Sequence, residues 1–403
     1  MSLCRLVVLL ILPACLVAAE PDRPYEVAYH AHFLPEEGHV EASVTVEQPL
    51  QRLVELDFNA PESRYSRFEG DGEVTREGRR LIWRVPREGG ELRYRVEVDQ
   101  VRSGAFDARL TDQWAVARLD NLFPPARVRS RVRASSNARL YLTGPKGWSF
   151  ETRYGPVGEQ GVAVDREGRR FDRPLGWFAA GDLGIRRARI AERRIAIAGP
   201  KDQGFRRMDM LTFLHWTLPE LVRIAPSLPQ RVAIVGGSQD MWRGGLSGPG
   251  SVYVHPDRPL VSGNATSTLL HELMHVAMEE PPVDGADWIV EGLAEYYSLV
   301  ILLRTSGISG SRFQRSLERL EDWARSEDGT LVDPSTGADT ARAALLFRDL
   351  DLELRQAGES LDGVTAELLS GRVSAERLEK LVARRLSKRS RVLAPVLTSM
   401  GEG

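Results

Sequence analysis

The hydrophobic pattern of this chain changes its period once, and that change limits the folds that the chain can adopt. Up to about residue 185, apolar and polar residues alternate in short segments such as YEVAYHAHF, HVEASVTVE and ELRYRVEVDQV. This period of two is typical of strands that bury one face. Beyond residue 264 the apolar residues recur at helical spacing. Helices are expected at roughly 265–279, 287–303, 310–325, 337–356, 361–370 and 374–387. The sequence therefore predicts a multidomain α+β protein.

Domain boundaries follow from these patterns. Residues 20–185 are predicted to form an N-terminal antiparallel β-domain, because turn signals such as EGDGE and REGG separate its strands. Residues 186–403 are predicted to form the second domain. Its first part, 186–262, combines the strand patterns RRIAIAGP and RVAIVGG with a helical pattern around Pro219, and is predicted to be an α/β subdomain. The remainder, 263–403, is predicted to be a helical subdomain.

Residues 1–19 have the features of a secretory signal peptide. Arg5 supplies a positive charge before an apolar run at 6–19, and small residues before Glu20 suit cleavage at that point. The run is short for a membrane span, so no stable span is expected. The sequence therefore predicts an exported protein, periplasmic or extracellular. A lipid anchor at Cys15 is the alternative, although the apolar run continues beyond that cysteine.

The composition removes several classes of chemistry. Both cysteines, Cys4 and Cys15, lie inside the predicted signal peptide. A mature chain would therefore have no disulfide bond, no cysteine-ligated metal and no thiol nucleophile. The 54 basic residues nearly balance the 56 acidic residues, for a formal charge of −2. So small a net charge indicates no basic excess for nucleic acid, and no nucleic-acid partner is expected.

Two histidines four residues apart are the strongest chemical signal in the sequence. His271 and His275 flank Glu272 in the helical pattern TSTLLHELMHVAM. Residues four apart lie on one face of a helix, so the two imidazoles can hold one zinc ion. Glu272 can then act as the general base on a water molecule at the metal. The alternative is a helix with two unremarkable histidines.

A second helical segment can complete this metal site. Residues 288–297 have the sequence WIVEGLAEYY, and the breaker-rich PPVDGAD before them turns the chain back. Glu291 is therefore expected as the third protein ligand of one zinc ion per chain. Three protein ligands leave the fourth position to water, which is the pattern of a catalytic zinc. Glu295 lies one turn later and is expected to accept a hydrogen bond from His271, with a solvated surface charge as the alternative.

The two segments together resemble the gluzincin zinc metallopeptidases, in particular the glycyl aminopeptidase family and, more distantly, aminopeptidase N. The end of that family's N-terminal β-domain is similar to FDRPLGWFAAGDLG, and the strands before its zinc helix are similar to RVAIVGG and GGLSGPGSVYV. A C-terminal helix segment resembles residues 342–364. The resemblance implies a thermolysin-like catalytic domain with a helical C-terminal part behind a β-domain. The family's C-terminal PDZ domain is not recognisable in this sequence.

Two positions depart from the family pattern. In such aminopeptidases a glutamate of the glycine-rich edge binds the free amine of the substrate, and the matching residue here is Ser247. A family tyrosine that stabilises the oxyanion is matched by the stretch DTARA, which has no tyrosine. Candidates for the missing contact to the oxyanion or the substrate are Tyr253, His255, Tyr297 and Arg342. Each also has an ordinary interpretation, such as strand packing, helix packing or a surface cation.

Three functions fit these observations. The leading one is a zinc metallopeptidase that hydrolyses a peptide or protein substrate; Ser247 favours an endopeptidase, but the choice between amino- and endopeptidase stays open. The alternative is a zinc-binding but catalytically weak protein that acts as a peptide-binding or assembly module, which the two departures favour. Glu272 favours the enzyme, because a binding module has no evident need for a general base. A third hypothesis, an adaptor with a vestigial fold, predicts no bound zinc.

Overall fold

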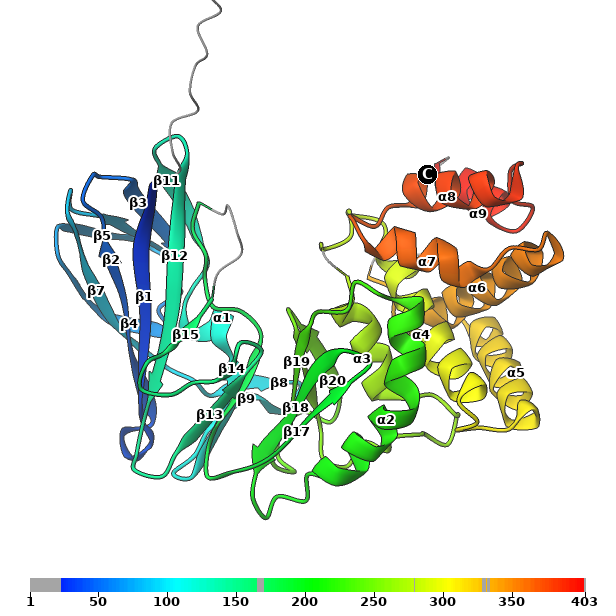
Figure 1. Ribbon diagram of the computed structural model, residues 1–403, viewed down its shortest axis with the longest axis horizontal. Coiled ribbons are helices and arrows are strands. Elements are labelled where there is room, and N and C mark those ends of the chain that lie inside the picture. The colour runs from blue at the N-terminus through cyan, green and yellow to red at the C-terminus, as the bar shows by residue number, and fades with distance from the viewer. Residues whose placement is uncertain (1–22, 165–169, 279, 328–330, 332–333, 402–403) are drawn as a thin grey trace, which may run out of the picture.

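The computed structural model describes residues 23–164, 170–278, 280–327, 331 and 334–401. The predicted signal peptide, both cysteines and the predicted cleavage point lie outside the described residues. Figure 1 shows strands in the N-terminal half, a smaller sheet in the middle and helices in the C-terminal part. Within the described residues, no helix is both long and apolar enough to cross a membrane. The mixed α+β class expected from the two periodicities is confirmed.

The longest strands form a six-stranded sheet in the order β15-β12-β1-β2-β7-β4. Its members are β1 (Arg23–Leu34), β2 (His39–Glu47), β4 (Tyr65–Gly70), β7 (Gly89–Val96), β12 (Ala134–Thr143) and β15 (Val162–Ala163). Val27, Tyr29 and Ala31 of β1 are buried at every second position, as the alternation predicts. However, β1 and β12 run parallel, which corrects the prediction of a purely antiparallel domain. Alternation specifies which face of a strand is buried, but not the direction of its neighbour.

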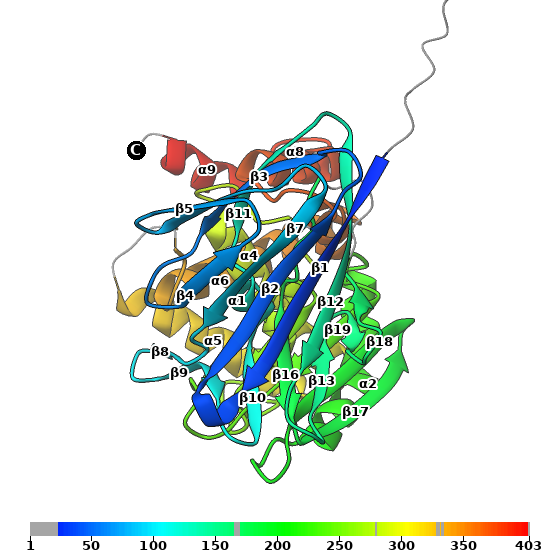
Figure 2. The same cartoon turned by 90° about the vertical axis from the view of Figure 1, so that its left-hand side faces the viewer.

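Two further sheets complete the N-terminal half, and Figure 2 shows the long strands in front of the helical part. One has the order β11-β3-β6-β5, with β3 (Leu53–Asn59), β5 (Glu73–Glu77), β6 (Arg80–Arg84) and β11 (Ala126–Ser130). The other has the order β14-β13-β16-β10-β9-β8, with β8 (Gln100–Arg102), β9 (Ala105–Leu110), β10 (Trp114–Arg118), β13 (Ser149–Thr152), β14 (Gly155–Pro156) and β16 (Trp177–Gly181). Short helical turns are η1 (Pro35–Glu37) and α1 (Leu119–Leu122). The three sheets share one hydrophobic core, in which Phe33, Trp83 and Phe178 are buried.

The middle of the molecule is a five-stranded sheet in the order β17-β18-β19-β21-β20. Its members are β17 (Leu183–Ile190), β18 (Arg193–Pro200), β19 (Arg231–Val235), β20 (Gly245–Gly248) and β21 (Ser251–Val254). The central strands β18, β19 and β21 run parallel and are largely buried, which explains their continuous apolar runs. Helix α2 (Arg207–Ile224) connects β18 to β19 and continues through Pro219, which lacks a backbone N–H donor. Strand β20 pairs with β21 alone and so forms an edge of the sheet.

The expected helices are present: α3 (Thr268–Val276), α4 (Asp287–Arg304), α5 (Gly310–Ser326), α6 (Ala338–Gln356), α7 (Leu361–Leu369) and α8 (Ala375–Leu386). A further helix, α9 (Leu393–Gly401), was not expected. Side-chain oxygens of Ser267, Ser309, Ser360 and Ser374 accept hydrogen bonds from backbone N–H groups at the starts of α3, α5, α7 and α8. Serine caps satisfy the free N–H groups of a first turn, so they explain where these four helices begin.

Helix α4 passes through the core of the helical part, and most of its side chains are buried. It packs closely against α6 at Gly292. A Cβ atom at this position would lie 2.6 Å from the Cβ atom of Ala343 and 3.0 Å from the ring of Phe347. The absence of a side chain at Gly292 therefore allows the two helices to approach, and the packing fixes the position of the neighbouring Glu291.

A small apolar cluster joins the N-terminal half to the middle sheet. Trp114 and Trp177, from β10 and β16, pack with Val235 and Tyr253, from β19 and β21. The β8–β9 hairpin extends this junction, because Phe106 exchanges backbone hydrogen bonds with the segment 240–242. The hairpin therefore supports the loop that leads into the edge strand β20.

Candidate metal centre

Helix α3 carries apolar and polar residues on different faces. His271, Glu272 and His275 are partly exposed on one face. The opposite face is buried and consists of Leu269, Leu270, Leu273, Met274 and Val276. Burial of the apolar face fixes the rotation of the helix, so the two histidines must point outward together, four residues and about one turn apart.

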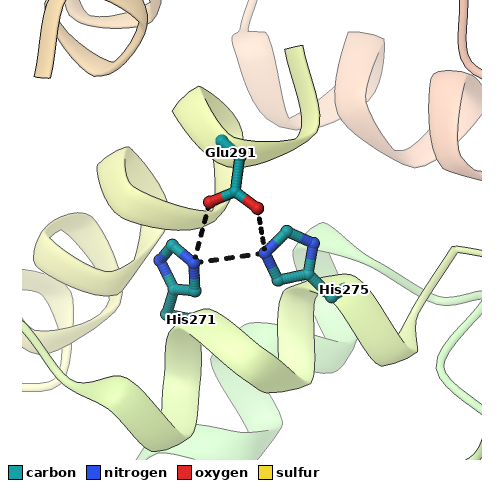
Figure 3. Close-up of side chains that lie close together, drawn as sticks. All are labelled: His271, His275 and Glu291. Atoms are coloured by element: carbon teal, nitrogen blue, oxygen red, sulfur yellow. Dashed lines mark hydrogen bonds and ion pairs between the residues drawn. The ribbon is translucent and has the colours of Figure 1, made fainter. Parts of the chain in front are cut away.

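Glu291 of α4 meets both histidines of α3, as Figure 3 shows. The Nε2 atoms of His271 and His275 are 3.1 Å apart. One carboxylate oxygen of Glu291 lies 3.3 Å from Nε2 of His271, and the other lies 3.3 Å from Nε2 of His275. The three donor groups thus converge on one point and lie within 4.8 Å of one another.

These spacings fit a zinc ion. A tetrahedral zinc with bonds of about 2.0–2.1 Å holds its ligand atoms roughly 3.3 Å apart. The three measured separations are 3.1, 3.3 and 3.3 Å. Two imidazoles and one carboxylate are also the ligand types of catalytic zinc sites, which keep a fourth position open. The residues expected from the sequence as metal ligands are therefore brought together, while their role as ligands stays a prediction.

Glu295 lies next to the other ring nitrogen of His271. One of its carboxylate oxygens is 3.3 Å from Nδ1 of His271, the partner expected from the sequence. An Nδ1–H group that donates to Glu295 leaves Nε2 without a proton and directed at the metal position. Glu295 can therefore set both the tautomer and the ring orientation of one ligand.

The charges of the site favour a cation between the two carboxylates. Burial disfavours the imidazolium form of His271, but hydrogen bonds with Glu291 and Glu295 outweigh it and raise the pKa of His271 to about 10. For Glu291, burial alone would raise the pKa, but hydrogen bonds from His271 and His275 hold it well below its ordinary value. Without a metal, a proton on His271 thus balances the carboxylates, and a divalent cation can take its place.

Glu272 borders a pocket of about 380 Å³ that also contains His271 and Glu295. Gly245 of the edge strand β20 lines the same pocket and lies close to Glu272. A Cβ atom at Gly245 would lie 2.8 Å from Cγ of Glu272 and 2.5 Å from Cγ2 of Thr268. The bare backbone of Gly245 therefore lets the edge strand approach the helix that carries the predicted general base.

Two of the four candidate contacts lie beside the edge strand, but their polar atoms have other partners. The hydroxyl of Tyr253 donates to the carbonyl oxygen of Trp242 at 2.9 Å. His255 is fully buried; its Nε2 lies 3.3 Å from the carbonyl oxygen of Gln239, and its Nδ1 accepts from the N–H group of Asp257. Burial lowers the pKa of His255, so the neutral ring is favoured.

The other two candidates lie on α4 and α6. The hydroxyl of Tyr297 is buried and donates to Asp362 at 3.0 Å. Arg342 pairs with Asp339 and also donates to the carbonyl oxygen of Glu327. Among the described residues that line the pockets bordering His271 and His275, none of the four candidates occurs. Their roles as oxyanion or substrate contacts stay predictions.

Ser247 lines a second pocket, of about 720 Å³, on the side of His275. Arg118 and Arg153 contribute to the same pocket, and Arg118 forms an ion pair of 3.0 Å with Asp120. Arg118 and Arg153 therefore lie near Ser247, at the position where the family resemblance implies a glutamate that binds the substrate's free amine. The sequence analysis did not single them out, because they belong to the N-terminal half and reach the site through folding alone.

Three residues of the pocket beside Glu272 were also missed by the sequence analysis. They are Trp242, before β20; Arg258, in the loop after β21; and Trp323, on α5. No motif marks them, since they are up to 81 residues apart in sequence. The only local signal is the pair of prolines on either side of Asp257 and Arg258, which indicates a stiff loop.

Comparisons by sequence and by structure give different results. No protein-family model matches the chain. No curated protein matches it either. Solved structures do match along most of its length. An aminopeptidase N family protein from Idiomarina loihiensis is similar with a TM-score of 0.64 and 14% identity, over 92% of this chain and 73% of that one. An M1 zinc metallopeptidase from Deinococcus radiodurans is similar with a TM-score of 0.58 and 17% identity, over 93% of both chains. The chain has the M1 peptidase fold.

A third similar structure is native leukotriene A4 hydrolase from Saccharomyces cerevisiae, with a TM-score of 0.57 and 14% identity. It is covered over 67% of its length, and this chain over 93%. The M1 fold confirms the resemblance to gluzincin peptidases that the two helical segments indicated. At these identities the likeness establishes the fold, so the chemistry of this chain has to be argued from its own site.

Proposed function

We propose that this protein is a zinc metallopeptidase that hydrolyses peptide bonds in a peptide or protein substrate. His271, His275 and Glu291 are the proposed ligands of one zinc ion per chain. The observation that carries the proposal is the convergence of their donor atoms within 4.8 Å, beside a pocket that Glu272 lines. The likeness in fold to zinc metallopeptidases supports the same class of reaction.

The side chains of α3 and α4 divide the chemistry between them. A zinc ion at this position supplies Lewis acidity toward the carbonyl group and the attacking water. Glu272 accepts a proton from that water and later donates it to the leaving amine. Glu295 keeps the proton of His271 on Nδ1, so that Nε2 faces the metal. This division of roles corresponds to the thermolysin-like arrangement that the family resemblance implies.

Ser247 supports a peptidase that does not require a free N-terminus. A hydroxyl group cannot balance the charge of a substrate ammonium group as a carboxylate does. Arg118 and Arg153 line the same pocket. We therefore expect the enzyme to cleave N-terminally blocked peptides. From the predicted signal peptide, we also expect it to act in the periplasm or outside the cell.

A second candidate function is a zinc-binding module with weak catalysis that holds peptides or assembles with other proteins. The observation in its favour is that Tyr253, His255, Tyr297 and Arg342 are all engaged by other groups. Loss of one oxyanion donor typically slows a hydrolase about 100- to 1000-fold. Such a protein would bind zinc and peptides but turn over slowly.

Zinc content and peptide cleavage separate these functions. Residues 20–403, the predicted mature chain, are purified beside Glu272→Gln and beside Glu318→Gln, a control on the exposed face of α5. We expect about one zinc per chain in all three proteins. Cleavage of a mixed peptide library should fall at least ~100-fold in Glu272→Gln, because a general base contributes about that factor or more. Glu318→Gln should cleave as the parent does.

The other outcomes of this experiment would favour a different function or contradict the interpretation of Ser247. Zinc in all three proteins without cleavage by any would favour the binding module. Absence of zinc from the parent protein would exclude both functions and favour an adaptor with a vestigial site. Release of N-terminal residues without cleavage of blocked peptides would contradict the interpretation of Ser247.

A further inference from the structure

Two tryptophans and one arginine line the pocket beside Glu272. Trp242 and Trp323 both line it, from the loop before β20 and from α5, and Leu320 adds an apolar surface. The guanidinium of Arg102 lies over the indole ring of Trp242, 4.9 Å from the ring centroid. Arg258 lines the same pocket. An apolar side chain with a negative group is the ligand that this combination suits.

The backbone of Arg258 is held in place while its side chain is exposed. Its N–H group donates to the carbonyl oxygen of His255 at 3.0 Å, and its own carbonyl oxygen accepts from Arg206 at 3.0 Å. Pro256 and Pro259 restrict the same short loop. A cation on so rigid a loop reaches the pocket with little backbone entropy left to lose on binding.

The charge of Arg258 is not neutralised by a neighbouring carboxylate in the part of the chain that the structure describes, where no ion pair within 4.0 Å involves it. Arg243, the residue after Trp242, differs because it pairs with Asp257 at 3.7 Å. Of the carboxylates in the pocket, Glu295 is matched by His271. Glu272 is the other, and it would repel an incoming substrate carboxylate unless a cation offset that repulsion.

The position of Glu272 indicates which part of a substrate occupies this pocket. As general base, Glu272 passes its proton to the leaving amine, so the chain that follows the scissile bond lies on its side. The pocket with Ser247, where the family resemblance implies the amino end of a substrate, instead borders His275. Arg258 therefore faces the leaving part of the peptide.

We infer that Arg258 binds a carboxylate of the substrate, on the residue that follows the scissile bond, while Trp242 and Trp323 cover apolar parts of that residue and its neighbour. The guanidinium group suits this role, because its planar fork can donate two parallel hydrogen bonds to a carboxylate. The carboxylate is either the C-terminal one of a short peptide or an acidic side chain. The identity of the ligand as a peptide rests on the proposed function; the binding of the carboxylate does not require turnover.

Binding to an inactive protein tests this inference independently of hydrolysis. Three probes are titrated calorimetrically into the zinc-loaded Glu272→Gln chain: N-acetyl-leucyl-phenylalanine, its C-terminal amide, and N-acetyl-leucyl-glutamate amide. At least one of the two probes with a carboxylate should bind about tenfold more tightly than the phenylalanine amide, as expected for one charge-assisted contact. Which of the two binds more tightly identifies the source of the carboxylate.

Substitutions assign the preference to one side chain. Arg258→Gln, added to the inactive chain, should reduce the preference to less than about twofold, whereas Arg258→Lys should keep part of it, because charge remains without the fork. Arg243→Gln should retain the whole preference. Thermal unfolding of each variant verifies that it is folded.

If neither carboxylate probe binds more tightly than the phenylalanine amide, or if no probe binds, the inference is overturned. A preference that survives Arg258→Gln overturns it as well. A clear preference in the inactive chain, combined with no peptide cleavage by the parent protein, would support the role of Arg258 while rejecting the proposed peptidase. The two hypotheses can therefore fail separately.

Discussion

His271 differs from His275 in having a carboxylate at each of its ring nitrogens. Its Nε2 faces Glu291, and its Nδ1 faces Glu295 at the same distance of 3.3 Å. For His275, the described contacts of the ring are with Glu291 and His271. The orientation of His271 therefore depends on a residue that does not itself face the metal position, and this dependence can be measured.

Glu295→Gln tests that dependence at the scale of one residue. An amide accepts the Nδ1–H hydrogen bond more weakly than a carboxylate, so the zinc affinity should fall about 10- to 100-fold, the usual effect of such substitutions. Competition with a chelator of known affinity measures the change, and Glu318→Gln serves as the control. An unchanged affinity would show that Glu295 is a solvated charge, the alternative interpretation.

At the scale of elements, the site depends on how closely two pairs of segments approach. The edge strand β20 reaches α3 at Gly245, and α4 reaches α6 at Gly292. Neither glycine has a positive φ angle, so the reason for glycine at both positions is space and not backbone conformation. The second contact matters for the metal, because Glu291 directly precedes Gly292.

Gly292→Ala should push α4 and α6 apart. The added methyl group would lie 2.6 Å from Cβ of Ala343 and 2.8 Å from its backbone carbonyl carbon, which cannot move aside as a side chain can. We expect a loss of about 1–3 kcal/mol in the free energy of unfolding, typical of overpacking, together with weaker zinc binding. Denaturant unfolding of the metal-free protein measures the first effect and chelator competition the second.

Gly310→Ala is the matched control for this substitution. Gly310 is also a helical glycine, at the start of α5, but a Cβ atom there would meet nothing within 4 Å. It should leave both quantities nearly unchanged. Equal behaviour of the two variants would mean that the packing at Gly292 does not restrain the site.

At the scale of the whole molecule, a group of charges ties distant elements together. Asp362 of α7 accepts from Arg304 of α4 and from Arg223 of α2, both at 2.8 Å, and from Tyr297 at 3.0 Å. Burial would raise the pKa of Asp362, but hydrogen bonds from Arg304 and Arg223 outweigh it and hold the pKa below its ordinary value. Helix α2, beside the middle sheet, and helices α4 and α7 of the helical part therefore share one contact that weakens in acid.

This contact predicts a stability that declines in acid. The unfolded chain binds a proton at the ordinary aspartate pKa of about 3.9, before the folded chain does. The stabilisation is therefore fully present above that pH and is lost as the pH falls below it and through the lower folded pKa. Asp362→Asn should cost roughly 1–3 kcal/mol at neutral pH, because it removes one of the two carboxylates that Arg223 and Arg304 share, while Glu220 still pairs with both.

Denaturant unfolding at several pH values between neutrality and about 3 measures the difference between the parent and Asp362→Asn. That difference should shrink as the pH falls, since protonation removes the same charge from the parent. Asp322→Asn, which removes an exposed pair with Arg325, is the control and should have little effect at any pH. A difference that does not change with pH would contradict the proposed charge dependence.

The sequence by itself determined the features that depend on neighbours along the chain. The spacing of His271 and His275 and the helical period are local, so they predicted helices and a pair of histidines on one face. Glu291 and Glu295 could be assigned to the same site because the segment before their helix turns the chain back. Their separation of one helical turn is also a local feature. The class of fold followed from the change of period.

Only the tertiary structure decided which distant segments meet. The parallel pairing of β1 with β12, the burial of Tyr297 against Asp362, and the meeting of Arg258 with Trp242 and Trp323 leave no local trace. Such contacts arise because whole faces of sheets and helices are buried together, and the same alternating or helical pattern is compatible with many neighbours. The predicted metal ligands were therefore readable from the chain, whereas the surroundings that would select a substrate were not.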